Sequence, residues 1–333
     1  MDKTIKVRDA ARSFILHNST WLKIVGKGAL TFASFLIINY YFGYVTILKN
    51  PIVAFVLAIG CAFIPFRAGG LIVMSYIFVH LTGLSVQVAV VFLLFMLASY
   101  VLSMFYGATH MFNINYAPVF LQVQLPYPIV LVSALCGKLS DVTPVICGGV
   151  LSFYLKVIRE NASLFIEEGQ DISVIDVISK RMIVNPLFYV YVVALIALFV
   201  IIVLVKDCKI KHAYAVSIVS GVFAEMVIMM LGYIMTGNIG KVPLLILANV
   251  IAVAVGVIMI FVFRDLDYER IEKVQFEDDD YLYYVTAIPK IELAREEKRI
   301  TRITDAKKDY HKIRRRVDRK EKDPDDVTDE ADG

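Results

Sequence analysis

The chain has 333 residues, of which 58% are hydrophobic and 20% are charged, and its formal net charge is +3. One soluble core could not bury so much apolar surface, so the composition excludes an ordinary soluble globular protein and predicts a body covered by lipid. About half of the Lys and Arg residues lie beyond Phe263. The chain therefore divides into an apolar body and an ionic tail.

Apolar segments of membrane-spanning length occupy most of the body, because a bilayer core of roughly 30 Å needs about 20 apolar residues per helix. Five are clear, at residues 29–47, 86–107, 182–205, 213–236 and 242–263. Four are short or carry Pro and Gly, at residues 51–66, 69–84, 117–137 and 142–158. We predict an all-α membrane protein, a polytopic helical bundle of about eight crossings with short Pro/Gly-broken or re-entrant helices. Its predicted parts are an amphipathic cytoplasmic lead (1–28), a transmembrane domain (29–263) and a charged cytoplasmic tail (264–333).

The distribution of basic residues predicts the orientation. Lys and Arg are frequent in the lead, in the loop at 206–212 and in the tail, so both termini should be cytoplasmic in a cell membrane. The loop at 159–181 then lies outside, although the basic residues that flank it favour the inside. Cytoplasmic termini require an even number of crossings, so one of the nine segments should be re-entrant or interfacial. Residues 5–15 form an amphipathic pattern that predicts docking on the lipid surface.

Prolines predict where the helical backbone is interrupted. Pro126 and Pro128 lack backbone donors and bias the residues before them away from helix, so segment 117–137 should break near Tyr127. Non-helical backbone at that depth must face protein or water.

A pattern of Pro and Gly in the first two short segments recurs in the other two, and we call it the internal echo. Its members are Pro51, Gly60, Pro65, Gly69 and Gly70, which recur in order as Pro128, Gly137, Pro144, Gly148 and Gly149. If three crossings separate the copies, the second runs opposite to the first, as in inverted-repeat transporters whose broken helices meet at a midplane site. The candidate transport path is then lined by Pro65, Pro128, Pro144, Gly148 and Gly149. Alternatively the echo arises by chance, since Pro and Gly are frequent in membrane helices.

Glu225 falls near the centre of segment 213–236, where an unpaired charge costs at least a few kcal/mol. The functional interpretation makes it a proton-coupling or cation-binding carboxylate on the transport path, with Arg67 or Lys138 as a candidate ion-pair partner. The alternative is a protonated, hydrogen-bonded packing residue. Arg67, Lys138 and Asp141 lie near turns between spans, so an interfacial position also explains them.

Motifs for catalysis are absent from the sequence. It contains no phosphate loop, no G-x-S-x-G and no H-E-x-x-H. His80 and His110 have no second ligand at metal-binding spacing, and the four cysteines form no CxxC pair. We therefore expect no enzyme activity, no cofactor, no metal and no nucleic-acid partner.

The tail combines an acidic run at 277–280 with an aromatic stretch at 281–289, which favours a strand. A lone strand has exposed edges, so it either folds back or pairs with a partner. Candidate partner-docking residues are Phe276, Tyr281, Tyr283 and Tyr284. The expected partner is a separate nucleotide-binding ATPase subunit or another cytoplasmic protein. A basic cluster at 312–322 could instead lie against anionic lipid.

Residues 274–290 resemble a tail signature found in multi-spanning membrane proteins of Gram-positive bacteria that are commonly labelled ABC transporter permeases. The likeness extends to the Pro-Tyr-Pro of 126–128 and to Cys147-Gly148-Gly149. It implies a permease-like subunit but assigns no functional residues. Permeases of one importer class have a cytoplasmic loop that docks the ATPase. The nearest match to it here is Ala224-Glu225 with Gly232, which lies inside a span, so the chain departs from that class.

Two functions are consistent with these features. The first is an integral membrane transporter or permease-like subunit. The alternative is a non-transporting scaffold of the cell envelope that recruits a cytoplasmic partner through its tail.

Overall fold

The computed structural model describes residues 11–166 except 12 and 16, then 173–208, 212–263, 272–277 and 282–287. Residues 1–10, 12 and 16 of the amphipathic lead, Tyr281 and the basic cluster at 312–322 lie outside the described residues. The helices are α2 (Ser19–Phe42), α3 (Pro51–Phe63), α4 (Phe66–Thr82), α5 (Val86–Phe105), α6 (Phe112–Phe120), η1 (Leu121–Val123), α7 (Pro126–Cys136), η2 (Leu139–Asp141), α8 (Val142–Glu160), α9 (Ser163–Ile166), α10 (Val174–Ile178), η3 (Ser179–Ile183), α11 (Pro186–Lys206), α12 (Ala213–Met235), η4 (Ile239–Lys241) and α13 (Val242–Phe263). The chain divides into two units, residues 1–264 and 265–333.

Six helical segments in the described part of the chain are long and apolar enough to cross a membrane: α2, α5, η2 with α8, α11, α12, and η4 with α13. The apolar helices α3, α4 and α7 are shorter. Large hydrophobic side chains are exposed along the outer helices, including Phe55, Leu94, Val219 and Leu247. Lipid is the environment that such a surface requires. The first unit is therefore a multi-pass, all-α membrane protein, as the composition predicts.

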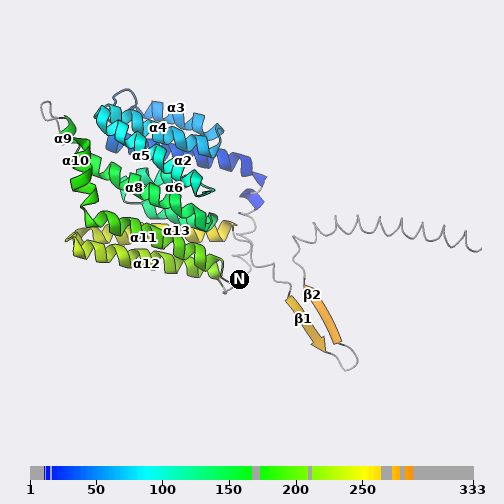
Figure 1. The fold of residues 1–333 in the computed structure, drawn as a ribbon. Helices are drawn as coiled ribbons and strands as arrows, with labels where there is room; N and C mark the ends of the chain where they lie inside the picture. The colour runs from blue at the N-terminus through cyan, green and yellow to red at the C-terminus, as the bar shows by residue number, and fades with distance from the viewer. Residues whose placement is uncertain are drawn as a thin grey trace, which may run out of the picture. The chain divides into compact units, whose positions relative to one another are not determined.

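The helices of this unit form two groups with three helices between them (Figure 1). The first group contains α2 to α5, and the second contains α11 to α13. Helix α6 packs against the first group, through α4 and α2, whereas α7 packs against α11 and α13 of the second. Because α6 and α7 also contact each other, they form a helical hairpin that joins the two groups.

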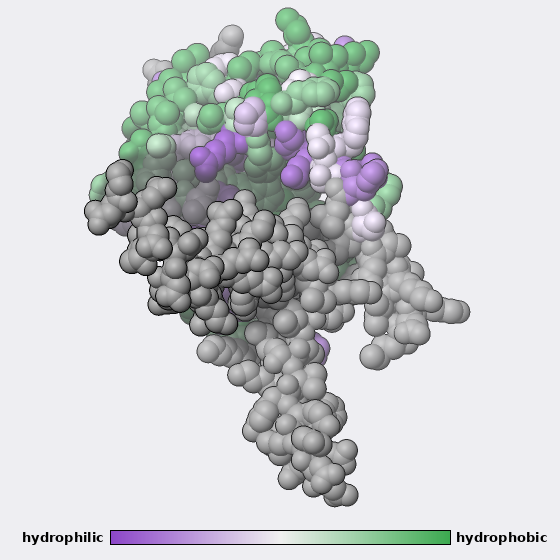
Figure 2. Space-filling model, turned by 90° about the vertical axis from the view of Figure 1, so that its right-hand side faces the viewer, coloured by the Kyte–Doolittle hydropathy of each residue, from purple (hydrophilic) through white to green (hydrophobic). Residues whose placement is uncertain are grey.

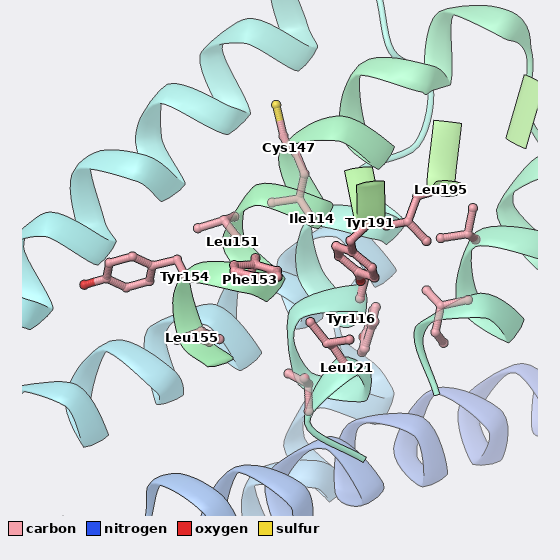
Figure 3. Packing of buried hydrophobic residues seen from close by; sticks show 14 of the residues in the cluster. Ile114, Tyr116, Leu121, Cys147, Leu151, Phe153, Tyr154, Leu155, Tyr191 and Leu195 are labelled. Carbon is pink, nitrogen blue, oxygen red and sulfur yellow. The ribbon is translucent and has the colours of Figure 1, made fainter. Parts of the chain in front are cut away.

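Helix α8 is the central helix of the bundle. Most of its residues are buried, whereas fewer than half of the residues are buried in each of the other five long segments. Figure 3 shows Ile114 of α6 and Leu195 of α11 beside α8, while Tyr154 points away from them. The Tyr154 hydroxyl donates to the carbonyl of Val88 in α5, with an O···O distance of 2.7 Å. Helix α8 thus contacts both helix groups through different faces.

The break in segment 117–137 precedes the prolines instead of falling at Tyr127. Residues 121–125 leave the α-helix, and Gln124 adopts a left-handed conformation at φ 61°. Pro126 is the first residue of α7 and Pro128 the third. A first helical turn has unpaired N–H groups in any case, so prolines start a helix there at no cost in hydrogen bonds. The predicted break is correct, but its predicted position is wrong by a few residues.

The first span begins earlier than predicted. Helix α2 starts at Ser19 and ends at Phe42, so it includes residues assigned above to the lead. Its basic residues are accommodated because they lie near the end of the helix, where they can reach polar groups. Lys27 donates from Nζ to the carbonyl of Ile64, at 2.9 Å, just beyond the end of α3.

The second unit contains two described strands, β1 (Glu272–Glu277) and β2 (Leu282–Ala287). They pair antiparallel in one two-stranded sheet, with Phe276 opposite Tyr283 and Gln275 opposite Tyr284. Strand β2 thus lies within the aromatic stretch, and β1 overlaps the acidic run at Glu277.

Candidate functional site

The two ends of the α6–α7 hairpin meet at a pocket of about 240 Å³. The residues that line it come from the start of α4, the start of α6 and the end of α7: Phe66, Arg67, His110, Met111, Phe112, Asn115, Val132, Ser133 and Cys136. Both hairpin ends therefore lie at one end of the bundle. Viewed from that end, hydrophilic residues gather between hydrophobic flanks (Figure 2).

Asp141 fixes one wall of this pocket, although it does not line it. Its buried carboxylate accepts from the backbone N–H groups of Thr109, His110 and Lys138, at 2.6, 3.1 and 3.0 Å. The Thr109 hydroxyl also donates to it, at 2.7 Å. These bonds attach the loop before α6 to the junction between α7 and α8. Four donors on one carboxylate satisfy its charge, so Asp141 acts here as a structural anion.

Arg67 joins the same network from α4. Its Nη2 donates to the carbonyl of Thr109, at 3.0 Å, and its side chain is exposed at the mouth of the pocket. Neither Arg67 nor Lys138 contacts Glu225, and no ion pair of either is present among the described residues. The candidate pairing of Glu225 with Arg67 or Lys138 is therefore wrong for this structure.

Polar side chains hold the hairpin together inside the bundle. Asn113 of α6 donates from Nδ2 to the Ser133 hydroxyl of α7, at 2.7 Å, and both residues are buried. The Tyr100 hydroxyl of α5 donates to Oδ1 of Asn115. Asn113 Oδ1 has no partner in the described part of the chain. The path between α6 and α7 therefore carries buried polar groups, which membrane interiors retain mainly for structure or function.

The end of α7 is stabilised by a cation. Lys206, the last residue of α11, donates from Nζ to the carbonyls of Ala134, at 2.7 Å, and of Leu135 and Gly137. These carbonyls have no partners within a helix that ends at Cys136, and a positive charge also interacts favourably with the helix C-terminus. Lys206 thereby connects the second helix group to the hairpin.

One glycine of each pair in the internal echo approaches the same helix, α6. A Cβ atom on Gly148 of α8 would lie 2.5 Å from the carbonyl oxygen of Asn113. A Cβ atom on Gly70 of α4 would collide with the Asn115 side chain. These glycines therefore let α6 fit between α4 and α8. Gly149 faces α11 instead, where its nearest neighbour would be a methyl group of Leu195 at 3.3 Å.

The two copies of the echo run in the same direction. The α3–α4 junction contributes Phe66 and Arg67 to the pocket, and the end of α7 contributes Cys136. Helices α3 and α7 thus lead to one end of the bundle, which contradicts the predicted inverted arrangement. Pro65 is the N-cap of α4 beside the pocket, whereas Pro128 and Pro144 are third residues of α7 and α8. None of the three prolines lines the pocket.

Glu225 lies on the other side of α7. It is fully buried in α12, and neither carboxyl oxygen has a hydrogen-bond partner among the described residues. Tyr127 of α7 and Asn249 of α13 are close enough to interact with it, without hydrogen bonds of good geometry, and Tyr191 of α11 and Tyr233 of α12 are near. Within the described part of the chain, the Tyr191 hydroxyl and Asn249 Oδ1 also have no hydrogen-bond partner. A buried polar cluster with this many unpaired atoms is costly, so it requires a proton, water or a cation to complete it.

Of the two histidines noted in the sequence, His80 is a buried structural residue and His110 lines the pocket. His80 lies 3.1 Å from Oδ1 of Asn39 through Nε2 and accepts from the N–H of Val45 through Nδ1, at 3.4 Å. In the described residues no group of three or more His, Cys, Asp or Glu could hold a metal ion.

Sequence reasoning missed the pocket residues Asn115 and Ser133 and the loop residue Thr109. A signal was available for Asn115, because it stands with Asn113 in a short apolar segment where amides are rare. Ser133 and Thr109 offer no such signal. For the tail, the sheet includes Phe276, Tyr283 and Tyr284, but their docking role stays a prediction.

Comparisons with known proteins returned no match: no family model, no curated protein and no solved structure corresponds to this chain. The resemblance to the permease-labelled family therefore stays a prediction.

Proposed function

We propose that this protein is a membrane transporter or permease-like subunit and that solute moves along the α6–α7 hairpin. One observation carries the proposal: an interrupted hairpin inside an apolar bundle ends at a pocket that it forms with the start of α4. Broken helices in membranes expose backbone groups only to protein or to a water-filled cavity. Transporters place such helices at their binding sites.

The position of the hairpin also suggests how it could move. It packs on one side against α2 and α4 and on the other against α11 and α13. A relative motion of the two helix groups would therefore change the environment of both hairpin helices. Alternating access in transporters proceeds through such rocking of one bundle against another around a fixed site.

A re-entrant hairpin accounts for the predicted number of crossings. Helices α2, α3, α4, α5, α8, α11, α12 and α13 then make eight crossings, and both ends of the membrane unit lie on one side. The lead, the loop at 206–212 and the tail continue the chain from that side and are rich in Lys and Arg, so we take it as cytoplasmic, although Lys49, Arg159, Arg181 and Lys241 lie at the opposite helix ends. A cysteine placed at Gln124 should be shielded from membrane-impermeant reagents added on the cytoplasmic side.

Glu225 is the proposed coupling residue. Its neighbours are Tyr127, Tyr191, Tyr233 and Asn249, with no basic group among them. Loss of a proton would place an uncompensated charge beside Tyr127, the second residue of α7, and would favour water entry there. Since another face of α7 lines the pocket through Val132 and Ser133, the proton state of Glu225 could bias solute binding.

The test compares sealed membrane vesicles that contain the wild-type protein, Glu225→Gln, Pro128→Ala or a chain truncated after residue 263. Small molecules accumulated from a cell extract are measured by mass spectrometry, against vesicles without the protein. Accumulation that depends on Glu225 or Pro128 and survives truncation supports transport. Accumulation equal to that of empty vesicles in every case refutes it.

The scaffold alternative is favoured by one observation, the sheet of β1 and β2. A two-stranded sheet is marginally stable by itself, and its open edges can accept another strand. Affinity purification with and without residues 264–333, followed by mass spectrometry, separates the two functions. A tail-dependent ATPase supports a transporter complex, whereas tail-dependent envelope-assembly proteins without an ATPase support a scaffold.

A further inference from the structure

We propose that the pocket at the hairpin mouth binds a small organic anion, a carboxylate carried on an apolar body. This inference rests on the proposed transport function, since it names the class of solute. It concerns binding, so it can be tested without measuring transport.

The polar groups of the pocket are donors. Arg67 uses one guanidinium nitrogen for Thr109 and has no other partner among the described residues. Asn115 is 1% exposed; its Oδ1 accepts from Tyr100, and its Nδ2 packs against Gly70 of α4. The Ser133 hydroxyl accepts from Asn113, which leaves its own proton free to donate. Two donors, Arg67 and Ser133, therefore remain available to a ligand that accepts hydrogen bonds.

Among the described residues, no acidic side chain lines the pocket to compete with an anion. The nearest carboxylate noted above, Asp141, is buried and occupied by four donors. The N-terminus of α6, at Phe112, adds a partial positive charge at the same place. Charge and hydrogen bonding thus select against a cation and favour a carboxylate.

The remaining surface of the pocket selects the rest of the ligand. Phe66, Met111, Phe112 and Val132 present apolar side chains. The volume of about 240 Å³ lies just below the range of about 300–1,000 Å³ that is usual for small-molecule pockets, so it suits a small ligand. Benzoate has the required carboxylate and a flat apolar body, and it serves as the probe.

The pocket contains its own reporter, since Cys136 lines it and is exposed. Cys208 is the other exposed cysteine, whereas Cys61 and Cys147 are buried. In detergent-solubilised full-length Cys208→Ser protein, benzoate should slow alkylation of Cys136 by N-ethylmaleimide in a saturable manner. Benzamide and benzylamine, which have the same ring without the negative charge, should not. In a Cys136→Ser background, alkylation of Cys208 should be unaffected by benzoate.

Arg67→Gln should raise the half-protecting benzoate concentration about tenfold, the effect of losing one charge-assisted hydrogen bond. Arg67→Lys should retain most of the protection. The matched control is Arg181→Gln, an exposed basic residue of η3 outside the pocket, which should change nothing.

Equal protection by benzoate, benzamide and benzylamine would overturn the inference, as would protection by phosphatidylglycerol in nanodiscs without any by benzoate. If Arg67→Gln fails to fold, the comparison of benzoate with benzamide and benzylamine on protein that retains Arg67 still tests the inference. Benzoate protection without transport of any solute would support the anion site and refute the transporter. Transport without benzoate protection would support the transporter and refute the anion site.

Discussion

The close approach of α8 to α6 predicts different outcomes for two neighbouring glycines. In Gly148→Ala, the new Cβ would meet backbone atoms of Asn113, with the carbonyl oxygen at 2.5 Å and the carbonyl carbon at 2.8 Å. Backbone cannot move aside as a side chain can, so α6 must shift. In Gly149→Ala, the Cβ would meet side-chain methyl groups of Leu195 and Val192 at 3.3 and 3.7 Å, which adjust easily.

The expected magnitudes follow from two opposing effects. Alanine gains about 1 kcal/mol over glycine in a helix, and overpacking costs about 1–3 kcal/mol, with the upper part of that range expected against backbone. Gly148→Ala should therefore lose at least about 2 kcal/mol relative to Gly149→Ala, which is about a 30-fold change in the unfolding equilibrium. Denaturation in mixed micelles with sodium dodecyl sulfate, followed by far-ultraviolet circular dichroism, measures this difference. Equal denaturation midpoints for the two variants would refute the packing of α6 against Gly148.

The polar contacts give three further predictions, each read by the same denaturation assay. Asp141→Asn should lower the free energy of unfolding by about 3 kcal/mol, because an amide cannot accept all four hydrogen bonds of the carboxylate. The control is Asp176→Asn at an exposed position, and equal midpoints for the two variants would contradict the hydrogen bonds to Asp141. Lys206→Met should lower the free energy of unfolding by about 2 kcal/mol, because the carbonyls at the end of α7 lose their donor, whereas Lys180→Met at an exposed position should not. An unchanged midpoint for Lys206→Met would contradict the role of Lys206 at the end of α7. Glu225→Gln should stay within about 1 kcal/mol of wild type, because no hydrogen bond is lost; a loss of about 3 kcal/mol would reveal a buried ionic partner.

Local sequence patterns located most of the helices. The five clear apolar segments all became long helices, and 142–158 became the sixth candidate span, α8 with η2. Prolines identified the interrupted segment because they lack a donor, although the break lies before Pro126. Hydropathy failed at the start of α2, since Lys27 reaches the carbonyl of Ile64 and is satisfied inside a helix that composition alone would begin later.

The sequence by itself determined the membrane class, the approximate spans, the interrupted hairpin segment and the place of Glu225 within an apolar helix, because these depend on the hydropathy and backbone chemistry of neighbouring residues. Only the tertiary structure decided that the echo copies run in parallel, that Asp141 binds the loop before α6, and that Arg67 lies at a pocket while Glu225 lies beyond α7. Each of these depends on contacts between residues far apart in the chain. Packing of whole helices selects such contacts, and local periodicity does not encode them.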